Sequence, residues 1–470
     1  MKLYRNAIIL VVIVALLVGA YFVISRNKAA DADQNASSTS TDTLKLVDYT
    51  TDKLEAVTLQ HPDGMFVLTQ QGTTWELTSP TDFKADPSIL SSVAINAASV
   101  TADKLVEENA QDLTKYGLDK PVVVKLKLKD KTEKSYEIGD KTPTKGGYYV
   151  KVTGENKVYV VGSYTCDQIL TDRNGLKSKD IFGITSDMIN RISMDRKGEN
   201  VFSSEADTQA KTSWSLLKPI KGNTNTSALT PMFEALAGTR VDEFIEEKPA
   251  DLSKYGLDKP SYALDFGTTT AGAFKLLLGD EKVKGSEMYA KLDGKDEVFT
   301  IDSTAYNFLD KPLKEIIDVF VYLVKIDQVT GIDLTMDGKT DTMKLDVYKD
   351  KDGKSDSDKD KFTFNGKDAS GKNADDKQPF REFYQALIGI GLDEVDLSGA
   401  APADSNPEIS VKYTLKDRTM KVDLVSKDDE YYYAFRNGEY ANILVKKTKN
   451  DFGVAGMKDS YKKLVDFLAK

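Results

Sequence analysis

A ten-residue motif occurs twice in this chain of 470 residues. Residues 112–121 read DLTKYGLDKP and residues 251–260 read DLSKYGLDKP, so nine of the ten positions are identical. A match of this length does not arise by chance, and internal repetition of this kind indicates duplicated structural units. The repeat constrains the fold more than any other feature, because both copies must be accommodated by the same structure.

The similarity between the two copies extends well beyond the motif. The only tryptophans, Trp75 and Trp214, occupy matching positions, and so do the Gly-Asp pairs at 139–140 and 279–280. The sequence separation between Gly139 and Gly279 is one residue larger than that between Trp75 and Trp214. One residue has therefore been inserted between the motif and the Gly-Asp pair, and the rest of each unit stays in register.

A third, divergent copy is predicted in the C-terminal third of the chain. Residues 326–347 resemble the start of the second unit at 189–202. Pro379 opens a helical pattern, and Pro407 precedes strands that end in the tyrosine-rich segment 430–435. This copy lacks both the tryptophan and the YGLDKP sequence.

Each unit combines β-forming segments with a helix. A helix is predicted to begin at Asp86-Pro87, because Asp is a good N-cap and Pro is tolerated at the first helical position. Apolar residues then recur at helical spacing, and the other two copies show the same pattern. These residues are Ile89, Leu90, Val93, Ala94, Ala97 and Ala98 in the first unit, Leu229, Met232, Phe233 and Leu236 in the second, and Phe380, Phe383, Tyr384, Leu387 and Ile388 in the third.

The motif itself predicts a short helical turn that stops at Gly117, because glycine takes the left-handed C′ conformation freely. Pro121 then leads into a strand that alternates apolar residues with lysines from Val124 onward. A meander of strands follows, and a closing helix is predicted over residues 169–176. Packing is the favoured interpretation of the motif, and a ligand-binding loop is the alternative.

Strands grouped together with helices to one side define an α+β fold. We therefore predict an N-terminal transmembrane helix followed by three tandem α+β repeat domains with antiparallel meander sheets. The predicted segments are a cytoplasmic tip with the transmembrane anchor (1–28), a flexible linker (29–43), repeat domain 1 (44–184), repeat domain 2 (185–320) and a divergent repeat domain 3 (321–470).

Residues 7–24 form an uninterrupted run without a charged or strongly polar side chain. As a helix this run would extend roughly 27 Å, just enough to cross a bilayer core. An uncleaved anchor is favoured over a signal peptide cleaved after Ala20, because most secretory h-regions are shorter. We expect a single-pass protein of the cell membrane that contacts the lipid bilayer through residues 7–24, with the bulk of the chain extracytoplasmic.

The residue counts exclude several classes of function. The net charge is −10 and there is no Arg/Lys stripe, so nucleic acid is not expected as a partner. Cys166 and His61 are the only cysteine and the only histidine, too few for an internal disulfide or a zinc site. We expect His61 to be exposed in a turn and Cys166 to be at least half-buried. No catalytic, cofactor-binding or metal-binding residue is predicted, and no cofactor.

Two groups of residues leave alternatives open. The acidic segment 350–358 is interpreted as a solvated insertion loop, with weak calcium binding as the alternative, because it lacks the EF-hand spacing and the glutamate at position twelve. Several tyrosines recur on the meander strands, where aromatic packing is favoured over stacking on sugars or on a protein partner. They are Tyr148, Tyr149, Tyr289, Tyr432 and Tyr433.

The single N-terminal apolar span, the Trp-x-Leu strand near Pro80, the DL-x-x-YGLD-x-P element and the Gly-Asp meander together resemble DUF4340, a bacterial domain of unknown function. The resemblance covers roughly residues 70–310, once per unit. It implies a membrane-anchored extracytoplasmic protein that accompanies ABC-type transporter components similar to gliding-motility auxiliary proteins. It implies no catalytic residues, because none are established for the family.

Taken together, these features predict a non-enzymatic binding or scaffold protein beside an ABC-type transporter or a gliding-auxiliary-like complex. The alternative is a module that binds, or a hydrolase that cleaves, cell-envelope polysaccharide or peptidoglycan.

Overall fold

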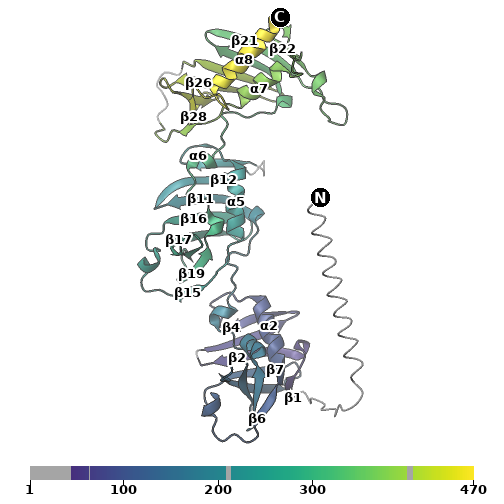
Figure 1. Cartoon of the computed structure of the whole chain (residues 1–470), viewed down its shortest axis with the longest axis vertical. Coiled ribbons are helices and arrows are strands. Elements are labelled where there is room, and N and C mark those ends of the chain that lie inside the picture. The colour runs from purple at the N-terminus through teal and green to yellow at the C-terminus, as the bar shows by residue number, and fades with distance from the viewer. Residues whose placement is uncertain (1–43, 63, 208–212, 400–405) are drawn as a thin grey trace, which may run out of the picture. The chain divides into compact units, whose positions relative to one another are not determined.

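The computed structural model describes residues 44–62, 64–207, 213–399 and 406–470. These residues form two compact units, the first ending at Ser178 and the second beginning at Lys179 (Figure 1). The predicted anchor at 7–24 and the predicted linker at 29–43 lie outside the described residues. Among the residues that are described, no helix is both long enough and apolar enough to cross a membrane.

The first unit is built on an eight-stranded antiparallel sheet. In spatial order its strands are β4 (Thr74–Ser79), β3 (Gly64–Gln71), β2 (Leu54–His61), β7 (Val122–Leu128), β8 (Glu133–Lys141), β9 (Gly147–Val152), β10 (Val158–Gly162) and β6 (Lys104–Glu107). A separate strand pair joins β1 (Leu44–Asp48) to β5 (Ser99–Ala102). The helices are η1 (Thr51–Lys53), α2 (Pro87–Ala98), η2 (Thr114–Tyr116), α3 (Ser163–Ile169) and α4 (Arg173–Leu176).

The second unit contains two nine-stranded sheets. Counting along the chain, we call them the second and the third sheet. In spatial order the strands of the second sheet are β14 (Gly222–Asn223), β13 (Trp214–Lys218), β12 (Glu199–Ala206), β11 (Ile189–Arg196), β16 (Tyr262–Thr268), β17 (Ala273–Val283), β18 (Glu287–Leu292), β19 (Glu297–Asp302) and β15 (Phe244–Glu247). The accompanying helices are η3 (Ser186–Met188), α5 (Thr226–Ala237), η4 (Ser253–Tyr255), η5 (Thr304–Tyr306) and α6 (Leu313–Ile316).

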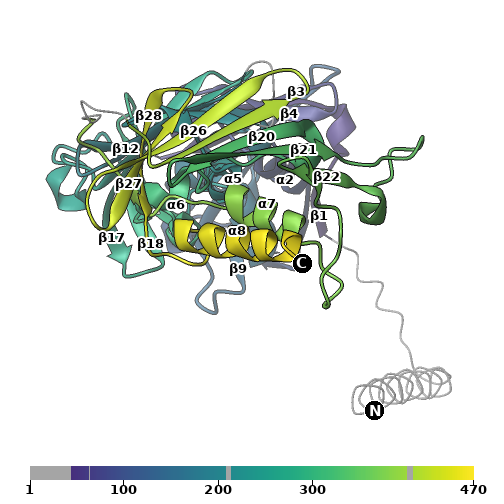
Figure 2. The same cartoon turned by 90° about the horizontal axis from the view of Figure 1, so that it is seen from above.

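The third sheet has the order β23 (Lys367–Asp368), β22 (Lys361–Phe364), β21 (Lys339–Asp346), β20 (Val329–Met336), β25 (Ile409–Leu415), β26 (Thr419–Ser426), β27 (Tyr431–Arg436), β28 (Glu439–Lys446) and β24 (Glu394–Val395). Its helices are η6 (Ile326–Gln328), η7 (Ser357–Lys359), α7 (Pro379–Ile388) and α8 (Val454–Leu468). Figure 2 shows α7 and α8 along the same face of this sheet. Phe383 of α7 lies 5.9 Å from Tyr461 of α8, measured between ring centroids.

All three large sheets share one connectivity. In each sheet the chain begins at a central strand and forms a meander outward to one edge. It then crosses over through a helix, adds a short strand at the opposite edge, and returns to the centre to form a four-stranded meander that ends beside this short strand. The predicted α+β class with antiparallel sheets is therefore confirmed. The domain boundaries at residues 184 and 320 remain predictions.

The helix-covered face of each sheet holds the main core. The first unit has its own core cluster, which includes Trp75, Leu90 and Tyr136. The buried apolar side chains of the second and third sheets form one continuous cluster. The opposite faces of the first and second sheets carry much smaller clusters, which are described below.

Two local expectations were wrong. The helix predicted over 169–176 is instead two short helices, because Asp172 caps α4 by accepting a hydrogen bond from the Gly175 backbone N–H at 2.7 Å. His61 is half-buried rather than exposed, because it is the last residue of β2 and its ring meets Phe66 edge-on at 5.6 Å.

Candidate functional site

The duplicated motif forms the same turn in both copies. Residues 114–116 and 253–255 are 3-10 turns that end at Gly117 and Gly256, whose φ angles of 64° and 65° are left-handed. The prediction of glycine stop residues is therefore confirmed. Each turn is opened by an aspartate side chain that accepts a hydrogen bond from a backbone N–H two residues later, at 3.1 Å in the first copy and 2.9 Å in the second.

Each turn lies directly on the Gly-Asp pair of the meander. A Cβ atom added to Gly139 would sit 2.2 Å from the backbone oxygen of Tyr116, and one added to Gly279 would sit 2.1 Å from that of Tyr255. No side chain fits at these distances, so the glycine permits a close backbone approach. This contact explains why the Gly-Asp pair recurs together with the motif.

The motif tyrosine makes a partly buried polar contact. Tyr116 is 8% exposed, and its hydroxyl donates to Glu107 at 2.6 Å. Lys115 pairs with the same carboxylate at 2.7 Å. These hydrogen bonds, first from Lys115 and then from Tyr116, hold the pKa of Glu107 below its usual range. The tyrosine hydroxyl and the lysine are therefore both occupied within the protein.

The second copy repeats this arrangement. Tyr255 donates to Glu246 at 2.6 Å, and Lys254 pairs with Glu246 at the same distance. Hydrogen bonds from Lys254 and Tyr255 likewise hold the pKa of Glu246 below its usual range. Each motif ring also packs at a tilt against a meander tyrosine, with ring centroids 4.8 Å apart for Tyr116 and Tyr149 and 4.9 Å apart for Tyr255 and Tyr289.

Around each copy of the motif, apolar side chains form a small cluster, which we call the outer cluster of that copy. The first outer cluster contains Ala110, Leu113, Tyr116, Leu118, Tyr149 and Val158. The second contains Ile245, Leu252, Tyr255, Leu257, Leu277, Tyr289 and Val298. The motif residues thus lie within packed apolar clusters on the sheet face opposite the main core.

A remnant of the motif survives in the third copy. Asp396 accepts hydrogen bonds from the Ser398 backbone N–H at 3.0 Å and from its hydroxyl at 2.6 Å, as Asp251 does from Ser253. The segment Asp396-Leu397-Ser398 matches 251–253 in sequence, a signal that the sequence analysis missed. Leu397 is 64% exposed, whereas its counterpart in the second copy packs against the outer cluster.

Cys166 and His61 lie in different surroundings within the first unit. Cys166 is fully buried in α3, and desolvation raises the pKa of its thiol to about 12. The thiolate, not the thiol, is the reactive nucleophile, so this side chain is chemically inert at neutral pH. His61 packs on Phe66 at the end of β2, as described above.

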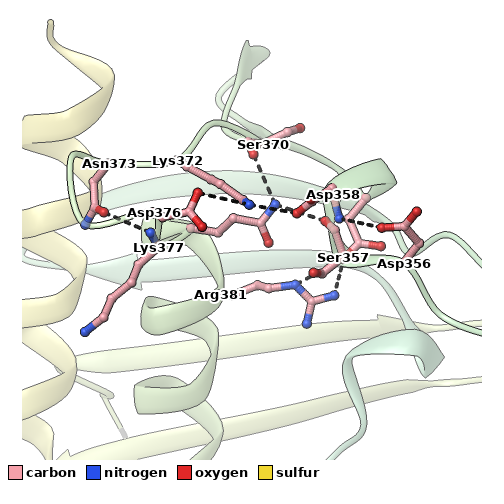
Figure 3. A network of polar contacts seen from close by, with 11 residues as sticks. Asp356, Ser357, Asp358, Ser370, Lys372, Asn373, Asp376, Lys377 and Arg381 are labelled. Atoms are coloured by element: carbon pink, nitrogen blue, oxygen red, sulfur yellow. Dashed lines mark hydrogen bonds and ion pairs between the residues drawn. The ribbon is translucent and has the colours of Figure 1, made fainter.

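The acidic insertion is held together by side-chain contacts (Figure 3). Asp356 accepts from the Asp358 backbone N–H at 3.2 Å. Lys372 bridges Asp358 at 2.9 Å and Asp376 at 3.2 Å, and Arg381 pairs with Asp360. Lysine and arginine thus neutralise much of the acidic charge. Within the part of the chain that is described, no group of three or more His, Cys, Asp or Glu side chains could hold a metal ion.

The remaining meander tyrosines also pack within the protein. Tyr432 is 3% exposed, and Tyr433 contacts Tyr440 with their ring centroids 5.4 Å apart. The hydroxyl of Tyr148 donates to Asp167 at 2.5 Å. These contacts agree with the favoured interpretation, aromatic packing.

The chain matches a known protein family. The family model described as "Domain of unknown function (DUF4340)" matches residues 75–224 and 214–418. Each matched region begins at one of the two tryptophans, Trp75 or Trp214. Neither the curated proteins nor the solved structures contain a match.

Proposed function

The chain belongs to the DUF4340 family, and from this membership we propose that it is a non-enzymatic binding or scaffold protein at the outer face of the cell membrane. In this proposal residues 7–24 anchor the chain in the bilayer. Three tandem repeat domains follow, and they bind an ABC-type transporter or a gliding-auxiliary-like complex. The resemblance of the sequence to membrane-anchored family members supports the anchor and the partner.

One structural observation carries the non-enzymatic part of the proposal. The element that the chain preserves in two copies is used for packing: its glycine lies against the sheet, and its tyrosine and lysine bind one carboxylate. A duplicated framework of this kind presents similar surfaces more than once along the chain, as repeat proteins do when they bind large partners.

The location can be tested with a single engineered thiol. Met65 on β3 is 51% exposed, whereas the only native cysteine is fully buried. A membrane-impermeant maleimide added to intact cells should therefore label Met65→Cys and leave the wild-type chain unlabelled. Labelling of Met65→Cys only after the cells are permeabilised would contradict the extracytoplasmic location.

The partner can be tested by cross-linking in intact cells. The full chain, tagged at its C-terminus, is cross-linked and purified, and the recovered proteins are identified by mass spectrometry. We expect permease and ATPase subunits with the full chain and their loss when residues 1–28 are removed. If the purified wild-type protein instead cleaves peptidoglycan or envelope polysaccharide, the scaffold proposal is wrong and the hydrolase alternative holds.

A further inference from the structure

We propose that the second sheet carries a binding site for a ligand with several phosphate groups, formed by Lys197, Lys259 and Lys275. The three lysines line a depression of about 540 Å³ on the sheet face opposite the main core. The site goes beyond the proposed scaffold role and does not depend on it. The apolar part of the lining comes from Pro260, Ala263 and Leu277.

The strand register explains how the depression forms. Asp195 of β11, Ala263 of β16, Leu277 of β17 and Lys291 of β18 lie opposite one another in a single row across four strands. Neighbouring strands lie about 4.8 Å apart, so each side chain of a row touches the next. Ala263 is the smallest residue of the row and leaves space above the sheet. Lys197 and Lys259 reach this space from the adjoining turns.

The corresponding row of the first sheet has a larger residue in place of the alanine and is neutral. It consists of Gln60, Val123, Glu137 and Lys151. Val123 takes the place of the alanine, and Glu137 takes the place of Leu277. Glu137 forms an ion pair with Lys151 at 3.0 Å, with side-chain exposures of only 15% and 10%.

The row of the third sheet also contains an acid at this position. It consists of Thr335, Ser410, Asp423 and Phe435, and Asp423 pairs with Lys421 at 2.9 Å. The second sheet is therefore the one of the three in which the acid is replaced by leucine. The change removes the negative charge from the place where the lysines of the second sheet gather.

These lysines have no partner among the described residues. No side chain of the three lysines, Lys197, Lys259 and Lys275, makes a hydrogen bond or an ion pair with another described residue. Many lysines elsewhere on the surface do form such ion pairs. Lys275 is half-buried, and Asp265, its neighbour across the strands, is already bound to Arg191 at 3.0 Å. The one carboxylate in the depression, Asp195, accepts from the Asn200 amide at 2.8 Å. The depression therefore keeps an excess of positive charge in a protein whose net charge is −10.

The chemistry of the lining favours phosphate. Lysine acts as a compact point charge and is a common phosphate binder. A phosphate monoester carries about 1.5 to 2 negative charges at neutral pH, so two or three such groups match three ammonium groups better than the same number of carboxylates. The apolar floor suits a short carbon skeleton between the phosphates.

The test is a calorimetric titration of the full-length chain, kept in a neutral detergent, with tripolyphosphate at low salt. The triple variant Lys197→Gln/Lys259→Gln/Lys275→Gln should bind about tenfold more weakly or worse, because the ligand is held by charge. The matched control, Lys120→Gln/Lys125→Gln/Lys134→Gln, removes the same charge from exposed lysines of the first unit and should bind within about twofold of wild type.

A second variant separates binding from folding. Leu277→Glu installs the acid that the first sheet has, opposite Lys291, and so it should form an ion pair similar to Glu137–Lys151 and lose tripolyphosphate binding. Circular dichroism verifies that each variant is folded. The proposal is overturned if both triple variants weaken binding equally, if Leu277→Glu folds and binds like wild type, or if the tricarboxylate tricarballylate binds as tightly as tripolyphosphate.

Discussion

Gly139 is the residue at which one added methyl group should do the most harm to the first unit. The Cβ of Gly139→Ala would lie 2.2 Å from the backbone oxygen of Tyr116, and neither backbone can yield without moving the motif off the sheet. We expect a loss of about 2–4 kcal/mol of unfolding free energy. Urea unfolding in a Trp214→Phe background measures it, because Trp75 is then the sole fluorescent tryptophan.

Gly146→Ala is the matched control. The nearest atom to its added Cβ, a Thr144 hydroxyl oxygen, is 3.8 Å away, so the change should stay within about 0.5 kcal/mol. If Gly139→Ala and Gly146→Ala have equal unfolding free energies, the stability of the first unit does not depend on the close contact between the motif turn and Gly139.

Glu107 should make the first unit depend on pH in the acid range. Its folded pKa is lowered by hydrogen bonds from Lys115 and then Tyr116, and the unfolded value is about 4.3. The stabilisation is therefore complete above the unfolded pKa and is lost as pH falls through the folded pKa. Glu107→Gln should unfold at lower urea than wild type at pH 7, and the difference should shrink below about pH 4.

Glu108→Gln provides the control for charge. The side chain of Glu108 is 76% exposed and lies 3.6 Å from Lys157, so removing its charge should leave the urea midpoint nearly unchanged across the same pH range. A difference between Glu107→Gln and wild type that stays constant from pH 7 to pH 3 would contradict the assigned role of Glu107.

Single residues differ in how far the sequence reveals their role. The left-handed Gly117 follows from local rules, because a turn that meets glycine and then proline has few other conformations. The contacts of Glu107 and Gly139 with Tyr116 could not be predicted. They join separate elements. The recurrence of the Gly-Asp pair marks Gly139 as part of the repeat, but the local pattern does not show that it contacts the motif, or that Glu107 does.

At the scale of elements, α2 depends on its cap. The Asp86 side chain accepts from the backbone N–H of Ser88 at 2.8 Å and of Ile89 at 3.4 Å. Asp86→Ala should lower the unfolding free energy of the first unit by about 1 kcal/mol, whereas Asp86→Asn, which can still accept, should change it by a few tenths. Trp75 fluorescence in urea measures both. If Asp86→Asn is as damaging as Asp86→Ala, the aspartate acts through its charge and not as a cap.

The helices show which elements a sequence can predict. The helices that begin at Pro87 and Pro379 were predicted because a proline and an apolar stripe agree. The C-terminal helix α8 was missed, although Met457, Tyr461, Leu464 and Leu468 follow a helical period within a lysine-rich segment. The sheet order was beyond prediction, because pairs such as β6 with β10 join segments that are distant in the sequence and no local signal records them.

At the scale of the whole molecule, the buried side chains divide into separate cooperative groups. Trp75 belongs to the core of the first unit, whereas Trp214 belongs to the cluster that continues from the second sheet into the third. The segment before the third sheet is hydrogen-bonded to the loop between α7 and β24, for instance from the Val321 backbone N–H to the Ile390 oxygen at 2.9 Å. The two tryptophans therefore report on two different cores.

A cavity in the third sheet should consequently be detected by Trp214 and not by Trp75. Phe383 is fully buried in α7, and Phe383→Ala should remove about 3–5 kcal/mol from the core that it shares with Trp214. In a Trp75→Phe background the urea transition of Trp214 should move to lower urea, whereas in a Trp214→Phe background that of Trp75 should stay in place. Leu90→Ala in α2, which is 2% exposed in the wild type, is the reciprocal variant and should move only the Trp75 transition. If Phe383→Ala leaves the Trp214 transition unchanged, the second and third sheets unfold as independent domains despite their continuous core.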